Sequence, residues 1–159
     1  MTIIGVDPGT TKSAAVWLID GNISDYMDAE NRVVRGALWA TVDKETVCAI
    51  ERIASYGMAV GADVFETCVW TGRFMQVWAD EQGSEAHRIT RKEIVVHLCG
   101  SPRAKDANVR QALIDRWGAP GTKKNPGPTY GITGDMWSAL AVATVAMDRI
   151  KAGMPVEAK

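Results

Sequence analysis

Long apolar runs and a secretory leader are missing from this sequence. No stretch reaches the ~18 consecutive apolar residues that a membrane-spanning helix needs. The N-terminus also lacks the charged flank and long apolar segment that mark a signal peptide. These absences argue against a membrane or secreted protein, so we expect a cytoplasmic one.

Histidine and cysteine are scarce as well. The two histidines, His87 and His97, are joined by no metal-binding spacing. The three cysteines, Cys48, Cys68 and Cys99, are odd in number, widely separated and each in an apolar neighbourhood. We therefore expect structural histidines, small reduced cysteines in the core, and no zinc site.

The composition that is present suits one globular domain. The chain has 159 residues and 47% hydrophobic content, enough for one domain with its own core, which we expect to span residues 1–159. The net charge of −1 hides an asymmetry, because residues 1–85 hold 6 Lys and Arg against 13 Asp and Glu, whereas residues 86–159 hold 12 against 6. The basic second half suggests a polyanion as partner, although such residues also serve as solvated surface.

The opening stretch, residues 2–12, is an apolar strand that ends in an acid. Ile3, Ile4 and Val6 suit a buried strand, and a Pro-Gly pair stops it directly after Asp7. Asp7 is therefore predicted at the carboxyl end of a core strand, where α/β sheets bind their ligands. The alternative is that Asp7 only opens the turn, a common role of Asp.

The rest of the chain alternates between strand and helix patterns. Further strands are predicted at 13–20, 23–27, 46–51 and 86–90, and helices at 61–82, 91–98, 106–117 and 135–150. Residues 31–40 fit either a short helix or a loop. Residues 119–128 are rich in Pro and Gly and are predicted to be a basic loop, neither helix nor strand.

The predicted helix at 61–82 carries an apolar stripe with helical spacing. We expect this stripe to be core. Its members are Val64, Phe65, Cys68, Val69, Gly72, Phe74, Met75 and Trp78.

Three acids stand out by their positions at element ends. Asp7 and Glu51 each end an apolar strand, and Asp135 stands at the start of the last helix, where a helix cap is the alternative role. If the strands are neighbours and the helix crosses their ends, the three carboxylates converge. Converging carboxylates repel one another unless a cation joins them, and oxygen ligands suit Mg²⁺ or Mn²⁺. A pair of such ions promotes phosphodiester hydrolysis.

These stretches resemble the RuvC family of Holliday junction resolvases, within the RNase H-like superfamily, and in particular its shorter phage-type members. Ile3-Ile4-Gly5-Val6-Asp7-Pro8-Gly9-Thr10 is similar to the opening strand of that family. Ala49-Ile50-Glu51-Arg52 resembles its second acidic motif, and the stretch from Asp135 to Ala143 resembles its C-terminal helix. The segment 105–118 resembles the basic segment before that helix. The likeness covers nearly the whole chain in the right order.

The resemblance implies an α/β fold, with an RNase H-like five-stranded mixed sheet flanked by helices. It further implies a homodimer that binds branched DNA and nicks two strands of a four-way junction, with two Mg²⁺ or Mn²⁺ ions in each active site. Asp7, Glu51 and Asp135 would be the catalytic metal ligands. A phage-encoded protein of this kind would act in the host cytoplasm.

The chain departs from the family pattern at Ser138, where the family usually has a fourth acid. Ser138 could hold a metal-bound water through its hydroxyl. Alternatively, the register shifts so that Asp135 fills the fourth place, or Asp106 contributes from outside the motif.

Contacts to DNA are expected from basic residues of the second half, because phosphate contact needs charge without base identity. The candidates are Arg103, Lys105, Arg110, Lys123 and Lys124. The family pushes an aromatic into the junction shortly after its second acid. Ala54 occupies the corresponding position here, and the nearest aromatic is Tyr56, which also suits a packing role. We expect recognition of junction shape with loose sequence preference.

Three other functions fit part of the pattern. The turn after Asp7 also resembles the first phosphate loop of actin-like ATPases and sugar kinases, but those proteins need two such domains and a second phosphate loop. A non-catalytic junction-binding module would account for Ser138. A broader endonuclease acting on forks or flaps would use the same acids.

Overall fold

The computed structural model describes residues 1–41, 45–54, 57 and 59–157. Five strands form one mixed sheet in the order β3-β2-β1-β4-β5. β2 pairs antiparallel with β1 and β3, whereas β4 and β5 run parallel to β1. The predicted five-stranded mixed sheet is confirmed. Its strands are β1 (Thr2–Asp7), β2 (Lys12–Ile19), β3 (Asn22–Glu30), β4 (Val47–Arg52) and β5 (His87–Thr90).

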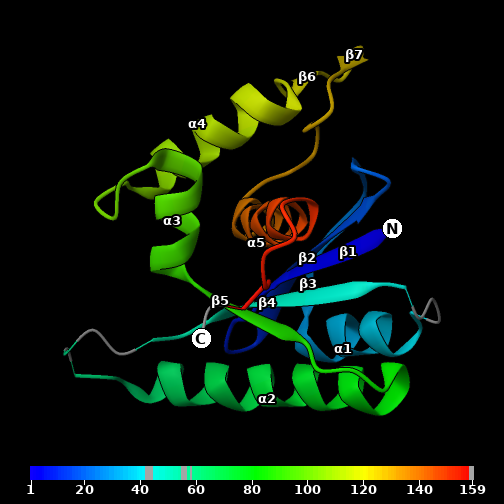
Figure 1. The fold of residues 1–159 in the computed structure, drawn as a ribbon, viewed down its shortest axis with the longest axis vertical. Helices are drawn as coiled ribbons and strands as arrows, with labels where there is room; N and C mark the ends of the chain where they lie inside the picture. Colours follow the sequence, from blue (N-terminus) through cyan, green and yellow to red (C-terminus); the bar gives the residue numbers. More distant parts are fainter. Residues whose placement is uncertain (42–44, 55–56, 58, 158–159) are drawn as a thin grey trace.

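Helices cover both faces of this sheet (Figure 1). The residues that the sequence left undecided between helix and loop form a helix. One face carries α1 (Asn31–Trp39) and α2 (Ala62–Gln82). The other carries α3 (Arg91–Cys99), α4 (Asp106–Trp117) and α5 (Met136–Lys151). None of the helices in the described ranges is long and apolar enough to cross a bilayer.

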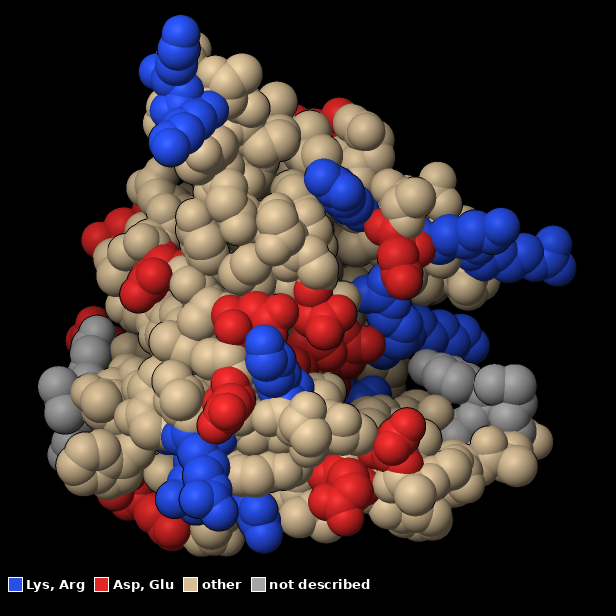
Figure 2. Space-filling model, turned by 180° about the vertical axis from the view of Figure 1, so that it is seen from behind, with Lys and Arg blue, Asp and Glu red and all other residues tan. Residues whose placement is uncertain are grey.

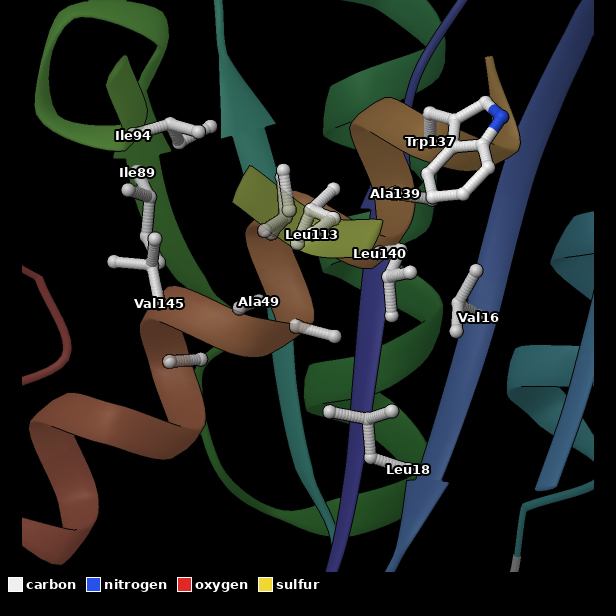
Figure 3. Close-up of a cluster of buried hydrophobic side chains, with 14 of the residues drawn as sticks. Val16, Leu18, Ala49, Ile89, Ile94, Leu113, Trp137, Ala139, Leu140 and Val145 are labelled. Atoms are coloured by element: carbon white, nitrogen blue, oxygen red, sulfur yellow. The ribbon is translucent and has the colours of Figure 1, made fainter. Parts of the chain in front are cut away.

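Helix α5 lies directly on the central strand β1. Its residues from Ala139 to Ala146 are fully buried, and Figure 3 shows several of them among side chains of the sheet. The close approach depends on Gly5, because a Cβ there would collide with the carbonyl oxygen of Ala139 and the amide nitrogen of Ala143. The missing side chain at Gly5 therefore lets the N-terminal end of α5 reach the carboxyl end of β1.

The segment 119–128 differs from its prediction. It forms a small hairpin of β6 (Gly121–Thr122) and β7 (Asn125–Pro126), so the expectation of neither helix nor strand is wrong there. Gly121 takes a φ of +67°, and the amide of Gly127 donates to the carbonyl of Pro120 at 2.8 Å. Proline is tolerated because this two-stranded ribbon is all edge and demands few ladder bonds.

The predicted core stripe of α2 is wrong in its first half. Phe74 and Trp78 are buried, as expected, but Phe65 is 63% exposed and Val69 is 46% exposed. The spacing of apolar residues shows that a helix has an apolar side, not which surface covers that side. Cys68 is exposed on the same helix, which corrects the prediction that all cysteines lie in the core.

The remaining cysteines and one histidine agree better with their predictions. Cys48 is buried and Cys99 is half-buried. The Nε2 atom of His97 lies 2.8 Å from Asp148, which also accepts hydrogen bonds from Arg116. His97 thus ties α3 to α5 and has a structural role.

Candidate active site

Asp7 ends β1 in the middle of the sheet. Burial, followed by the charges of Glu51 and Asp135, raises the pKa of Asp7 to about 8. The turn after it is held by other residues: Gly9 donates its amide to the Ser13 hydroxyl at 3.0 Å, and Asn31 donates to the Gly9 carbonyl at 3.1 Å. A turn-opening role is therefore not needed to explain Asp7.

Glu51 lies beside Asp7 on the neighbouring parallel strand. Because Val6 pairs with Ile50 in the sheet register, the residues that follow them reach the same edge. Burial is the largest influence on Glu51 and raises its pKa. The positive charge of Arg91 opposes this shift, whereas the charges of Asp106 and Asp135 add to it.

Asp135 immediately precedes α5. Its backbone is already helical, with φ −70° and ψ −14°, and its carboxylate accepts no capping hydrogen bond from the described part of the chain. The cap that the sequence offered as an alternative role is therefore not formed. Asp135 is exposed, and its charge contributes to raising the pKa of both Asp7 and Glu51.

Ser138 joins the same group from the first turn of α5. The proximity of its hydroxyl to Asp7 lowers the pKa of that carboxyl and partly offsets the effect of burial. The residue that departs from the family pattern thus lies near the carboxylate at the end of β1 and favours its ionised form.

The chemistry of these donors suits a hard divalent cation. Asp7, Glu51 and Asp135 offer only oxygen ligands, and their mutual repulsion would be relieved by positive charge. Within the described ranges, however, no three His, Cys, Asp or Glu side chains are drawn together closely enough to hold a metal ion. The three elements therefore bring the acids into one neighbourhood without closing a coordination shell.

Arg91, which sequence reasoning missed, lies next to the site together with Asp106, which the sequence offered as a contributor from outside the motif. Arg91 begins α3 directly after β5, and its charge lowers the pKa of Asp7 and of Glu51. Asp106 forms an ion pair with Arg91, so its carboxylate is engaged by an arginine. The signal was available for Arg91, because it follows a strand parallel to those that deliver Asp7 and Glu51.

The predicted DNA-binding residues are exposed but spread out. Arg103 and Lys105 precede α4, and Arg110 on α4 stacks over the Trp137 ring at 5.1 Å. Lys123 and Lys124 form the turn between β6 and β7. Tyr56 lies outside the described residues.

The charges on the surface agree with the wide distribution of the predicted DNA-binding residues. Figure 2 shows acidic side chains gathered near the middle of one face, with basic side chains around them and at the top, where the hairpin lies. A set of basic groups that surrounds an acidic centre is suited to hold a polyanion against that centre.

Comparison with known proteins supports the fold. The sequence matches no protein-family model and no curated protein sequence. Thermus thermophilus RuvC has a similar structure, with a TM-score of 0.67 and 18% identity over 97% of this chain and 98% of that chain. T. thermophilus RuvC in complex with Holliday junction substrate is similar at a TM-score of 0.72 and 15% identity, over 96% of each chain. The chain therefore has the RNase H-like fold of RuvC, as its motifs predict.

Proposed function

We propose that this protein is a structure-selective endodeoxyribonuclease that resolves four-way DNA junctions by metal-dependent hydrolysis of phosphodiester bonds. The observation that carries the proposal is that β1, β4 and the start of α5 bring Asp7, Glu51 and Asp135 into one neighbourhood, where their charges influence one another. The fold that brings them together is shared with a RuvC whose structure contains a Holliday junction.

The proposed metal ligands are Asp7, Glu51 and Asp135, with Ser138 at the edge of the site. Bound Mg²⁺ or Mn²⁺, in a pair, would supply the charge that activates water and stabilises the leaving oxygen. The chain itself contributes orientation and desolvation. The hydroxyl of Ser138 favours the ionised form of Asp7, and burial of Asp7 and Glu51 strengthens the electrostatic field that the substrate meets.

A homodimer would match the two-fold symmetry of a four-way junction, because one chain carries one acidic site. The exposed apolar side of α2, which we call the α2 face, supports such a dimer. It consists of Phe65, Cys68, Val69 and Gly72. At Gly72 no described atom lies within 4 Å of the position of a Cβ, so a second helix could approach closely there.

The first test is cleavage of a labelled, immobile four-way junction with Mg²⁺ or Mn²⁺, with linear duplex as control. We expect paired nicks near the branch point that are lost in Asp7→Asn. Forks and flaps in the same assay separate a junction resolvase from a broader branched-DNA endonuclease. Junction binding without cleavage in either metal would instead indicate a non-catalytic binding module. A protein that neither binds nor cleaves the junction would contradict the proposal.

A further inference from the structure

Arg91 completes a row of charged residues at one edge of the sheet. The parallel strands β1, β4 and β5 end there: Asp7 and Glu51 follow the paired residues Val6 and Ile50, and Arg91 follows the last residue of β5, two positions beyond the partner of Glu51. Two positions in the row are acids that we propose bind metal. The third is an arginine, whose positively charged guanidinium cannot serve as a ligand of a metal cation.

The two ends of the Arg91 guanidinium are in different situations. Nη2 forms the ion pair with Asp106, whose side chain is 92% exposed. Nη1 is buried and has no hydrogen-bond partner among the described residues. An unpaired buried donor is costly, so such a group commonly marks a place where a ligand supplies the acceptor.

The surroundings of Arg91 leave room for that ligand. Arg91 lines an open hollow of about 510 Å³ together with Lys92, Val95, Pro102, Ala104 and Asp106. The charge of Arg91 also lowers the pKa of Asp7 and of Glu51, so Arg91 links this hollow to the acidic site. If Arg91 served only to neutralise those acids, we would expect Nη1 to bond one of them.

We propose that Arg91 is a phosphate-binding residue of this site, with Nη1 donating to a non-bridging oxygen of the phosphodiester that is cleaved, and that Asp106 is the positioning residue that holds Nη2. This inference rests on the proposed nuclease function. Arginine suits the role because its rigid fork serves two acceptors at once, here a carboxylate and a phosphate.

The test compares four-way junctions that carry either a normal phosphate or a neutral methylphosphonate at the cleavage position. Binding is measured with Ca²⁺, and cleavage with Mg²⁺. For the parent protein we expect the methylphosphonate to weaken binding several-fold. In Arg91→Gln we expect weaker binding of the normal junction, no further loss with methylphosphonate, and cleavage slower by about 100-fold, the typical effect of removing one donor to a developing oxyanion.

Lys92→Ala is the matched control, because it removes a positive charge one residue along the same hollow. In Lys92→Ala, the methylphosphonate should still weaken junction binding several-fold, as in the parent protein. Asp106→Asn should slow cleavage less than Arg91→Gln, and the double variant should be no slower than Arg91→Gln alone, because Asp106 acts through Arg91. Arg91→Lys, which keeps the charge without the fork, replaces Arg91→Gln if the latter fails to fold.

The outcomes separate the two proposals. Cleavage by the parent, combined with an undiminished methylphosphonate effect in Arg91→Gln, would overturn the role of Arg91 and leave the nuclease intact. Binding without cleavage by the parent would overturn the nuclease, and the binding comparison would still decide whether Arg91 reads the phosphate. A parent protein that binds no junction would overturn both.

Discussion

At the scale of single residues, the buried carboxylate of Asp7 lowers the stability of the folded protein. Asp7 is forced into a buried position beside two other acids, and its pKa of about 8 lies well above the ordinary 3.8. The folded protein therefore binds this proton more tightly than the unfolded chain does. Stability falls as pH rises between these two values, because ionisation of Asp7 is easier after unfolding.

We expect Asp7→Asn to stabilise the metal-free protein while it abolishes cleavage. Asn removes the buried charge, and at pH 8 each ~1 kcal/mol gained should raise Tm by about 2–4 °C for a chain of this size. Thermal unfolding in EDTA at pH 5 and pH 8 measures the effect, which should be larger at pH 8. Asp28→Asn, an exposed position on β3, is the control and should leave Tm nearly unchanged.

In the parent protein, divalent ions should offset the loss of stability that the ionised Asp7 carboxylate causes. Mg²⁺ or Mn²⁺ should raise Tm of the parent at pH 8, because an ion that binds only the folded state stabilises it, and should raise that of Asp7→Asn much less. Equal increases in the two proteins would contradict a role of Asp7 as ligand.

At the scale of elements, the contact between α5 and β1 brings the acids together. Gly5→Ala should destabilise the fold by about 1–3 kcal/mol, because the added methyl group meets the backbone of α5 and the packed core cannot yield freely. Denaturant unfolding measures the loss. Gly36→Ala is the matched control: no described atom lies within 4 Å of a Cβ at this helical position, so it should be neutral or stabilising by ~0.5–1 kcal/mol.

The α2 face gives a second prediction at this scale. Phe65→Glu should convert a dimer to a monomer, since it places a charge in the centre of a proposed apolar contact. Analytical ultracentrifugation reports the mass, and paired nicking of a junction should become single nicking. Val33→Glu changes an exposed apolar residue on α1 and should leave the mass unaltered. A monomeric parent protein would refute the dimer.

At the scale of the whole molecule, charge is arranged around the acidic centre. The predicted DNA-binding residues of the second half are distributed over the α3–α4 connection, α4 and the β6–β7 turn. Contacts so far apart suit a long duplex arm, since α4 alone spans roughly 18 Å at 1.5 Å per residue.

Replacing Lys123 and Lys124 by Ala should weaken junction binding and flatten its salt dependence. Each lost phosphate contact should reduce the slope of log K against log salt by about 1, without changing sequence preference. Binding titrations at several salt concentrations give the slope. Arg35→Ala, on α1, serves as a control outside this basic set, and an equal change of slope there would argue against a specific role of the hairpin.

The sequence by itself determined the sheet and the positions of the acids along it. Apolar strands that end in Asp7 and Glu51 are local patterns, and the last helix is marked by its own spacing. Such features are readable because they follow from the periodicity of the backbone and from turn chemistry. The small hairpin at 121–126 was missed, because two-residue strands leave no periodicity to detect.

Only the tertiary structure decided which surfaces are covered and which charges meet. Phe65 and Phe74 share one apolar helix, yet one is exposed and the other buried, because burial depends on what packs against each turn. Likewise, Arg91 and Asp106 are 15 residues apart and pair only once α3 and α4 fold together. Ion pairs and buried donors arise from contacts between elements, and local sequence carries no record of those contacts.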